Sequence, residues 1–248
     1  MKLQDQVAIV TGSAAGVGRA TAIMLAKEGA NVVVNYTKSE AEARETVDAI
    51  EALGRKAIMV RADVSDDQQV NVMVDRAVEA FGRVDILVNN AGTTVMIPFK
   101  DMDAVTEEGW DRVFAVNVKG VFFCSRAAAR VMRQQGSGCI VNVASIAGLV
   151  AAGSSIAYAA SKAAVVNMTK TMALGLAPII RVNCVAPSFI DTRWNAPRPE
   201  MLPKVAERAA LKRVSKPEDI AEVIVSLVTS AAFVTGQTVP IDGGQFLA

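Results

Sequence analysis

Residues 7–18 read VAIVTGSAAGVG, a four-residue apolar run followed directly by a turn that contains three glycines. An apolar run without alternation is typical of a strand that is covered on both faces of a parallel sheet. Glycines permit a tight turn and let backbone N–H groups approach a phosphate, and the following helix points its positive end at the same group. Gly12, Gly16 and Gly18 are spaced Gly-x3-Gly-x-Gly instead of the more familiar Gly-x-Gly-x-x-Gly. The stretch therefore predicts the strand, phosphate loop and helix of a dinucleotide-binding domain.

The rest of the chain repeats this alternation of short apolar runs and helix-length segments. Further strands are predicted at 32–34, 57–60, 86–88, 140–143, 182–185 and 238–241, and helices at 40–53, at 66–81 and from Pro217 onward. Strand–helix alternation implies a parallel sheet with helices on both faces. We therefore expect an α/β fold, a single Rossmann-type, doubly wound domain over residues 1–248. The proline-rich segment at about residues 188–211 is predicted to be a mobile loop that serves as a lid over a ligand.

The composition excludes several kinds of chemistry. Of the 248 residues, 52% are hydrophobic and 21% are charged, which indicates a folded globular chain. The 26 basic and 25 acidic residues nearly cancel, so no broad nucleic-acid surface is expected. The chain has no histidine, which excludes Ser-His-Asp hydrolysis, an imidazole base and a histidine-ligated zinc ion. No metal site is predicted.

Cysteine usage and hydropathy favour a cytoplasmic location. Cys124, Cys139 and Cys184 show no CxxC spacing and lie in apolar stretches, so they are predicted to be buried, reduced thiols. The apolar run at Val7–Val10 is too short for the core of a secretory signal. The uncharged stretch from Gln134 to Ser161 is interrupted by polar residues and glycines, which favours a buried region over a membrane-spanning helix.

The end of the second predicted strand bears on the choice of cofactor. Residues 35–39 read NYTKS and lack the carboxylate that commonly binds the ribose 2′-hydroxyl of NAD. Thr37, Lys38 and Ser39 are suited to hold a 2′-phosphate instead. We therefore favour NADP(H), with NAD(H) as the alternative if Lys38 is only a solvated surface charge.

Two later segments are predicted to complete the cofactor site. Asp63 and Val64 follow the third strand and are expected near the adenine. Asn90, Ala91 and Gly92 follow the fourth strand and are expected along the ribose. Both predictions rest on the rule that open parallel sheets bind ligands at the carboxyl ends of their strands.

A candidate reactive group lies at Tyr158 and Lys162, which are four residues apart and so project from one face of a helix. A free tyrosine has a pKa of about 10, and a neighbouring ammonium stabilises the phenolate and lowers that pKa. Ser145, just after a predicted strand, is placed to bond a substrate oxygen. Asn117 lies in a helical pattern, where it bonds either a backbone carbonyl or a water beside Lys162.

Taken together, these motifs resemble the short-chain dehydrogenase/reductase family nearly end to end. Asn117, Ser145, Tyr158 and Lys162 match the catalytic tetrad of that family, and NNAG at 89–92 matches its ribose-side stretch. The resemblance implies a seven-stranded parallel sheet, metal-free hydride transfer and, usually, a homotetramer. It also implies these cofactor-binding residues: Gly12, Ser13, Ala15, Gly16, Val17, Gly18, Tyr36, Thr37, Lys38, Ser39, Asp63, Val64, Asn90, Ala91, Gly92, Tyr158, Lys162, Pro187, Ile190 and Thr192.

Within the family, the chain is most similar in pattern to 3-oxoacyl carrier-protein reductases and related bacterial ketoreductases. It lacks the arginines that the former place near the substrate entrance, since Arg133 and Arg181 lie close to those positions without matching them. Ser188 also replaces a usual glycine, and Trp194 follows it. We therefore predict an NADP(H)-dependent carbonyl reductase, or secondary-alcohol dehydrogenase, for small or medium apolar ketones. The alternatives are a 3-oxoacyl carrier-protein reductase, an NAD-dependent sugar or steroid dehydrogenase, and a cofactor-binding protein without turnover.

Overall fold

The computed structural model describes residues 1–195 and 199–247 and contains one parallel sheet of seven strands. The strand order is β3-β2-β1-β4-β5-β6-β7, so the chain runs outward from β1 to β3, crosses back to β4 on the other side of β1, and then runs outward to β7. The strands are β1 (Val7–Val10), β2 (Asn31–Tyr36), β3 (Ala57–Arg61), β4 (Ile86–Asn89), β5 (Gly138–Val143), β6 (Ile180–Pro187) and β7 (Thr238–Ile241). This doubly wound arrangement confirms the predicted fold class.

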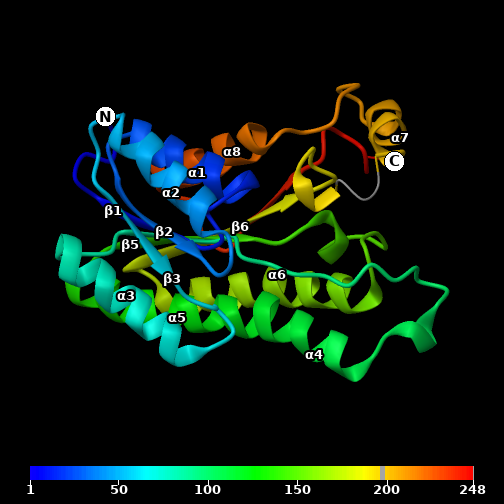
Figure 1. Cartoon of the computed structure of the whole chain (residues 1–248), viewed down its shortest axis with the longest axis horizontal. Helices are drawn as coiled ribbons and strands as arrows, with labels where there is room; N and C mark the ends of the chain where they lie inside the picture. The colour runs from blue at the N-terminus through cyan, green and yellow to red at the C-terminus, as the bar shows by residue number, and fades with distance from the viewer. Residues whose placement is uncertain (196–198, 248) are drawn as a thin grey trace.

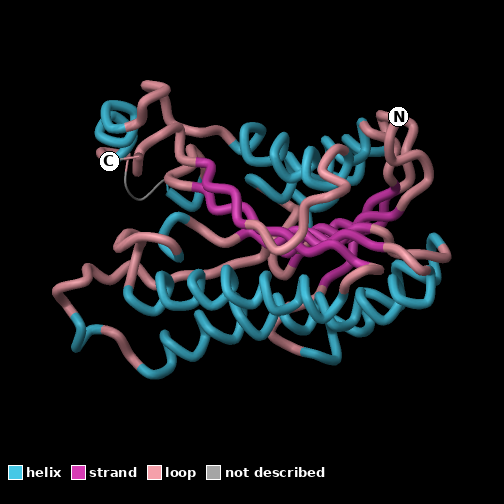
Figure 2. The backbone as a smooth tube through the Cα atoms, turned by 180° about the vertical axis from the view of Figure 1, so that it is seen from behind, coloured by secondary structure: helices cyan, strands magenta, loops and turns pink. Residues whose placement is uncertain are grey.

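Helices cover both faces of the sheet, as Figures 1 and 2 show from opposite sides. One layer contains α1 (Gly16–Lys27), α2 (Glu40–Glu51) and α8 (Pro217–Thr229). The other contains α3 (Asp67–Phe81), α4 (Glu107–Phe114), α5 (Gly120–Gln135) and α6 (Ile156–Leu176), while the short α7 (Met201–Arg208) lies beyond the sheet.

Apolar packing on both faces of the sheet explains why the strands are apolar without alternation. Ala8 and Val10 pack with the α1, α2 and α8 layer, whereas Ile9 between them packs with the α3 and α5 layer. Every residue of β1 is buried, because successive side chains point to opposite faces and both faces are covered. The three cysteines are buried and unpaired, as predicted, and burial raises the pKa of the Cys124 thiol to about 12.

The segment at about 188–211, which is predicted to be a mobile loop and lid, includes regular secondary structure. It contains a 3₁₀ turn at Arg193–Asn195 and the helix α7, while residues 196–198 of the predicted lid lie outside the described residues. Pro203 does not prevent α7 because it lies in the first turn, where backbone N–H groups have no partner within the helix. Val205 is buried and fixes the inner face of this helix.

No helix in the described ranges is both long enough and apolar enough to cross a membrane. The same residues also contain no cluster of three or more cysteine or acidic side chains that could hold a metal ion.

Candidate active site

A cavity of about 1080 Å³ opens at the carboxyl ends of the strands. It exceeds the usual upper limit of about 1,000 Å³ for the pocket of one small molecule, which fits a site for two ligands. Of the predicted site residues, these line it: Gly12, Ala15, Gly16, Val17, Tyr36, Thr37, Lys38, Asp63, Val64, Asn90, Ala91, Gly92, Ser145, Tyr158, Lys162, Pro187, Ile190 and Thr192. The fold thus brings residues from six strand ends to one cavity.

Four predicted residues do not line the cavity: Ser13, Gly18, Ser39 and Asn117. Ser13 is fully buried, and its hydroxyl donates to the Val10 carbonyl (2.7 Å), so it holds the glycine-rich loop from inside. Ser39 is the residue that precedes α2. These four residues support the segments beside the cavity and do not face the space that a ligand would fill.

The glycine-rich loop is folded tightly against β2 and β4. Gly12 and Gly16 have φ of +62° and +55°, values that favour glycine. The Gly12 N–H donates to Asn35 Oδ1 (3.0 Å), and Asn90 Nδ2 donates to the Thr11 and Gly12 carbonyls (2.9 and 3.1 Å). Within the described chain, no side chain caps the first turn of α1, so its N–H groups face the cavity side with their dipole available for an anion.

Gly18 marks the tightest contact in this loop, which gives a first testable prediction. A Cβ at position 18 would lie 2.4 Å from the Gly12 carbonyl oxygen and 2.6 Å from Asn90 Nδ2. We expect Gly18→Ala to displace the loop, to lower the stability by about 1–3 kcal/mol and to weaken cofactor binding. Urea unfolding and cofactor titration measure both effects. The control is Gly175→Ala, whose Cβ would meet nothing within 4 Å; equal losses in both variants would contradict the steric argument.

Asp63 lines the cavity beyond β3, but its carboxylate is already engaged. Arg112 forms an ion pair with it at 3.0 Å, and Ser65 donates to it from both its backbone and its hydroxyl. Burial alone would raise the pKa of Asp63, yet the hydrogen bonds from Ser65 and Arg112 hold that pKa below its ordinary value. Asp63 is therefore an ionised wall residue with its own partners.

The predicted reactive pair lies on one face of α6. Ser155 caps this helix by accepting the Tyr158 N–H (3.1 Å), which fixes where the helix begins. Lys162 Nζ lies 5.7 Å from the Tyr158 ring centroid and donates to the Val143 carbonyl (2.8 Å). Desolvation lowers the pKa of the buried Lys162 to about 8, so the amine is still mostly protonated at neutral pH.

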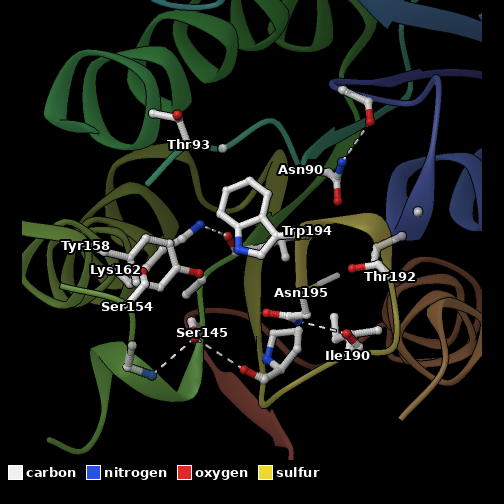
Figure 3. Close-up of a pocket in the computed structure, with 18 of the residues that line it drawn as sticks. Asn90, Thr93, Ser145, Ser154, Tyr158, Lys162, Ile190, Thr192, Trp194 and Asn195 are labelled. Atoms are coloured by element: carbon white, nitrogen blue, oxygen red, sulfur yellow. Dashed lines mark hydrogen bonds between the residues drawn. The ribbon is translucent and has the colours of Figure 1, made fainter. Parts of the chain in front are cut away.

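Ser145 lies where β5 ends, beside this pair (Figure 3). Its hydroxyl accepts the Ala147 N–H (3.2 Å) and donates to the Pro187 carbonyl (3.3 Å). Both contacts are long, and the side chain lines the same cavity as Tyr158. A substrate oxygen could therefore compete for the Ser145 proton at small cost.

Asn117 lies in a single π-helical stretch, Ala115–Lys119, between α4 and α5. Its amide nitrogen donates to the Thr93 carbonyl (3.0 Å) and to Ser161 Oγ (3.0 Å), and its oxygen accepts the Thr93 N–H (2.8 Å). Of the two roles left open by the sequence, the bond to a backbone carbonyl is present, and the bond to a water beside Lys162 stays a prediction. π-helical turns occur frequently at functional sites, because the extra residue redirects the following side chain.

The segment after β6 forms the wall across from the glycine-rich loop. Thr192 lies near that loop, since its methyl carbon would be 3.8 Å from a Cβ on Gly16. Asp191 N–H donates to the Ser215 carbonyl (3.0 Å), and the Ser215 hydroxyl donates to the Phe189 carbonyl (3.0 Å). These bonds tie the start of the predicted lid to the segment that precedes α8.

Sequence reasoning missed several lining residues. Asn35 carried a usable signal, because a polar residue at the end of a buried strand needs a partner. Arg112, Arg208 and the C-terminal pair Gln245 and Phe246 carried none, since only the folded chain brings them to the cavity.

Comparison with known proteins gives matches over nearly the whole chain. Residues 12–245 match the family described as Enoyl-(Acyl carrier protein) reductase. The chain is 41% identical to a 3-oxoacyl-[acyl-carrier-protein] reductase of Thermotoga maritima, over 98% of this chain and 99% of that protein. It is 40% identical to the cis-4-hydroxycyclohexanecarboxylate dehydrogenase of Sinomonas cyclohexanicum, over 97% and 96% of the two chains. A short chain dehydrogenase from Burkholderia cenocepacia J2315, solved in complex with NADP, superposes with a TM-score of 0.92 at 38% identity and covers 99% of each chain.

Proposed function

Because the chain belongs to the short-chain dehydrogenase/reductase family of oxidoreductases that act on carbonyl or alcohol groups, we propose that it is an NADP(H)-dependent carbonyl reductase. The substrate would be a small or medium apolar ketone, or the matching secondary alcohol in reverse. One observation carries the proposal: Ser145, Tyr158 and Lys162 line the same cavity as the glycine-rich loop. A proton donor and a phosphate-binding loop at one cavity suit hydride transfer to a carbonyl.

The residues at the cavity fit a dinucleotide. Side chains at Gly12 or Gly16 would be strained by their positive φ, and the uncapped start of α1 suits a pyrophosphate. Lys38 and Thr37 are exposed at the end of β2, where they would bind a 2′-phosphate. When bound, NADP(H) supplies or accepts the hydride; Pro187, Ile190 and Thr192 would border its nicotinamide side, and Gly92 would border its ribose.

Tyr158 would transfer the proton in this reaction. In the reducing direction its hydroxyl donates a proton to the carbonyl oxygen, and the Lys162 ammonium stabilises the phenolate that remains. The Ser145 hydroxyl would donate a second hydrogen bond to that oxygen in exchange for its long bond to Pro187. Asn117 would act through its neighbours, because its amide holds the backbone of Thr93 on the cavity wall.

The direct test is to measure initial rates with NADPH and NADH across a panel of ketones. We expect turnover with NADPH and a lower kcat/KM with NADH. Absence of turnover with every ketone and both cofactors, in a protein that binds NADPH, would contradict the proposal and support a binding role without chemistry.

Cofactor preference gives a second prediction. Lys38→Ala removes the cation proposed for the 2′-phosphate, and a charged hydrogen bond is worth about 1.5–3 kcal/mol, or about 10–100-fold. We expect kcat/KM with NADPH to fall by that factor while the value with NADH stays unchanged. Lys27→Ala is the control, since Lys27 lies at the far end of α1. Equal losses with both cofactors would contradict the assignment of Lys38.

The contacts of Arg181 favour a free ketone over a carrier-bound acyl chain. Its guanidinium donates to the carbonyls of Leu227 and Val228 (2.9 and 3.1 Å), so it is used inside the fold. Arg133 donates to the Gly175 carbonyl (3.1 Å). Docking of an acidic carrier protein would depend on such cations and would weaken with salt. Activity that required a carrier and fell with ionic strength would support the 3-oxoacyl reductase alternative.

Self-association is part of this proposal. Leu174 and Phe233 are 83% and 105% exposed, and such large apolar side chains favour burial between copies of the chain. The homotetramer, the single catalytic domain over 1–248 and the cytoplasmic location stay predictions. Sedimentation tests the first of them.

A further inference from the structure

An aromatic side chain that the proposed chemistry does not use faces the proposed proton donor. Trp194 lies in the 3₁₀ turn after β6, and its ring centroid is 6.4 Å from that of Tyr158, with the two ring planes inclined by 49°. It lines the cavity, where Figure 3 shows its indole between Tyr158 on one side and Asn90 and Thr192 on the other. The indole therefore borders the space beside the Tyr158 ring, where a substrate of Tyr158 would lie.

The neighbours of Trp194 hold its position from both sides. Arg193 forms an ion pair with Glu42 on α2 at 2.9 Å. Asn195 donates through its side chain to the Ile190 carbonyl (2.8 Å) and through its backbone to the Thr192 carbonyl (3.0 Å). These contacts hold the chain on both sides of Trp194. A binding surface that is preorganised in this way can discriminate between ligands.

The wall on another side of Tyr158 is made of small residues. Ala151, Ala152 and Gly153 line the cavity there. A Cβ on Gly153 would lie 2.9 Å from the Ala147 Cβ and 3.4 Å from Cδ1 of Tyr158, so this part of the wall fits closely around the phenol ring. The space beside the phenol is thus bordered by a flat aromatic face and by a wall of small side chains.

We propose that Trp194 is a specificity-determining residue that selects aryl alkyl ketones, a proposal that rests on the reductase function above. The aryl ring of the substrate lies against the indole, and the short alkyl group lies toward Ala151 and Ala152. Aromatic pairs gain stability beyond that of the buried area alone, whereas a puckered aliphatic ring of equal size cannot match the flat face. The same contact orients the carbonyl toward Tyr158 and Ser145.

The experiment compares two ketones of similar size, acetophenone and cyclohexyl methyl ketone. The quantity measured is the ratio of their kcat/KM values, because intrinsic reactivity cancels when that ratio is compared between variants. We expect Trp194→Ala and Trp194→Leu to lower the acetophenone preference about tenfold, and Trp194→Phe to keep most of it. Leucine and phenylalanine are both apolar and both smaller than tryptophan, so Trp194→Leu and Trp194→Phe together separate loss of the aromatic face from loss of volume.

The other tryptophan provides a matched control. Trp110 stacks on Phe114 within α4, with ring centroids 5.2 Å apart, and does not line the cavity. We expect Trp110→Phe to leave the ratio unchanged. It also leaves Trp194 as the single tryptophan, so acetophenone should change the emission of Trp110→Phe protein and leave that of Trp194→Phe protein unaltered.

The outcomes distinguish this inference from the function on which it rests. If Trp194→Ala and Trp194→Leu reduce ketones with the wild-type ratio, the inference is wrong while the reductase function stands. If acetophenone binds without any change in the emission of Trp194, the inference is wrong as well. If the wild-type protein reduces no ketone with either cofactor, the proposed function fails, and the role of Trp194 fails with it.

Discussion

Replacing Tyr158 by phenylalanine is expected to lower kcat for ketone reduction by about 10²–10⁴-fold, the range that a positioned general acid contributes. The substitution removes only the hydroxyl, so the ring still packs against Trp194 and still lies near Lys162. NADPH affinity should stay close to that of the wild type. Steady-state rates and a fluorescence titration of NADPH measure the two quantities on the same preparation.

Ser145→Ala provides a graded comparison for this variant. Ser145 would donate a hydrogen bond without transferring the proton, so its loss should cost less than that of the Tyr158 hydroxyl. Turnover by Tyr158→Phe at a rate above that of Ser145→Ala would show that another group donates the proton. With no histidine in the chain, that group would be a water or another side chain that can donate a proton, such as Tyr36, which also lines the cavity.

Replacing Lys162 by methionine is expected to have the second large effect, and it acts on activity and stability in opposite directions. Turnover should fall by about 10²-fold or more, because the phenolate loses its neighbouring charge. The shift of the Lys162 pKa from 10.5 to about 8 by burial corresponds to a destabilisation of about 3 kcal/mol when the amine is charged. Methionine retains an unbranched apolar side chain at this position and removes that cost.

The pH dependence of the free energy of unfolding identifies the cost of burying the charged Lys162 amine. Below about pH 8, Lys162 is charged in the folded and the unfolded chain, so the wild type bears the full cost. Between pH 8 and 10.5, the folded chain binds fewer protons than the unfolded chain, so the wild type gains stability with rising pH relative to Lys162→Met. Above pH 10.5 the difference in stability between the wild type and Lys162→Met is constant. The Val143 carbonyl loses its donor in the variant at every pH, and this loss is independent of the window.

Urea unfolding of both proteins at pH 7, 9 and 10 measures this difference. Lys162→Thr, in which a shorter polar side chain replaces the amine, is a second variant that also removes the charge. A stability difference that does not vary from pH 7 to pH 10 would contradict a buried, charged amine at this position.

The sheet and most of the site could be predicted because their signals are local. Val7–Val10 and the glycines after it specify a strand, a turn and a helix within one stretch of chain, and the structure contains all three. The β5 strand begins at Gly138, before the predicted start at 140, because Gly138 pairs with Ile180 on β6. Pairing with a neighbouring strand extends a strand beyond the apolar residues from which it can be predicted.

Other features depended on contacts that no local pattern encodes. Arg112 reaches the cavity only because α4 lies beside the end of β3, where it meets Asp63. Asn117 was correctly placed in a helical region, but the π-helical stretch that turns it toward Thr93 has no sequence signature. Pro203 suggested an irregular loop, since a proline is read as a helix breaker unless the first turn can be located.

The strand order also has a consequence for how the chain acquires its shape on the ribosome. The central strand β1 pairs with β2 on one side and with β4 on the other, so Ala8 meets Val32 early and Ile86 much later. Until β4 has been synthesised, β1 exposes an unpaired edge to solvent, and such edges recruit other chains. Parallel pairing over this separation is slow, because the entropy of the long intervening loop is lost first. The nascent chain is therefore exposed to aggregation through this edge until β4 can pair with β1.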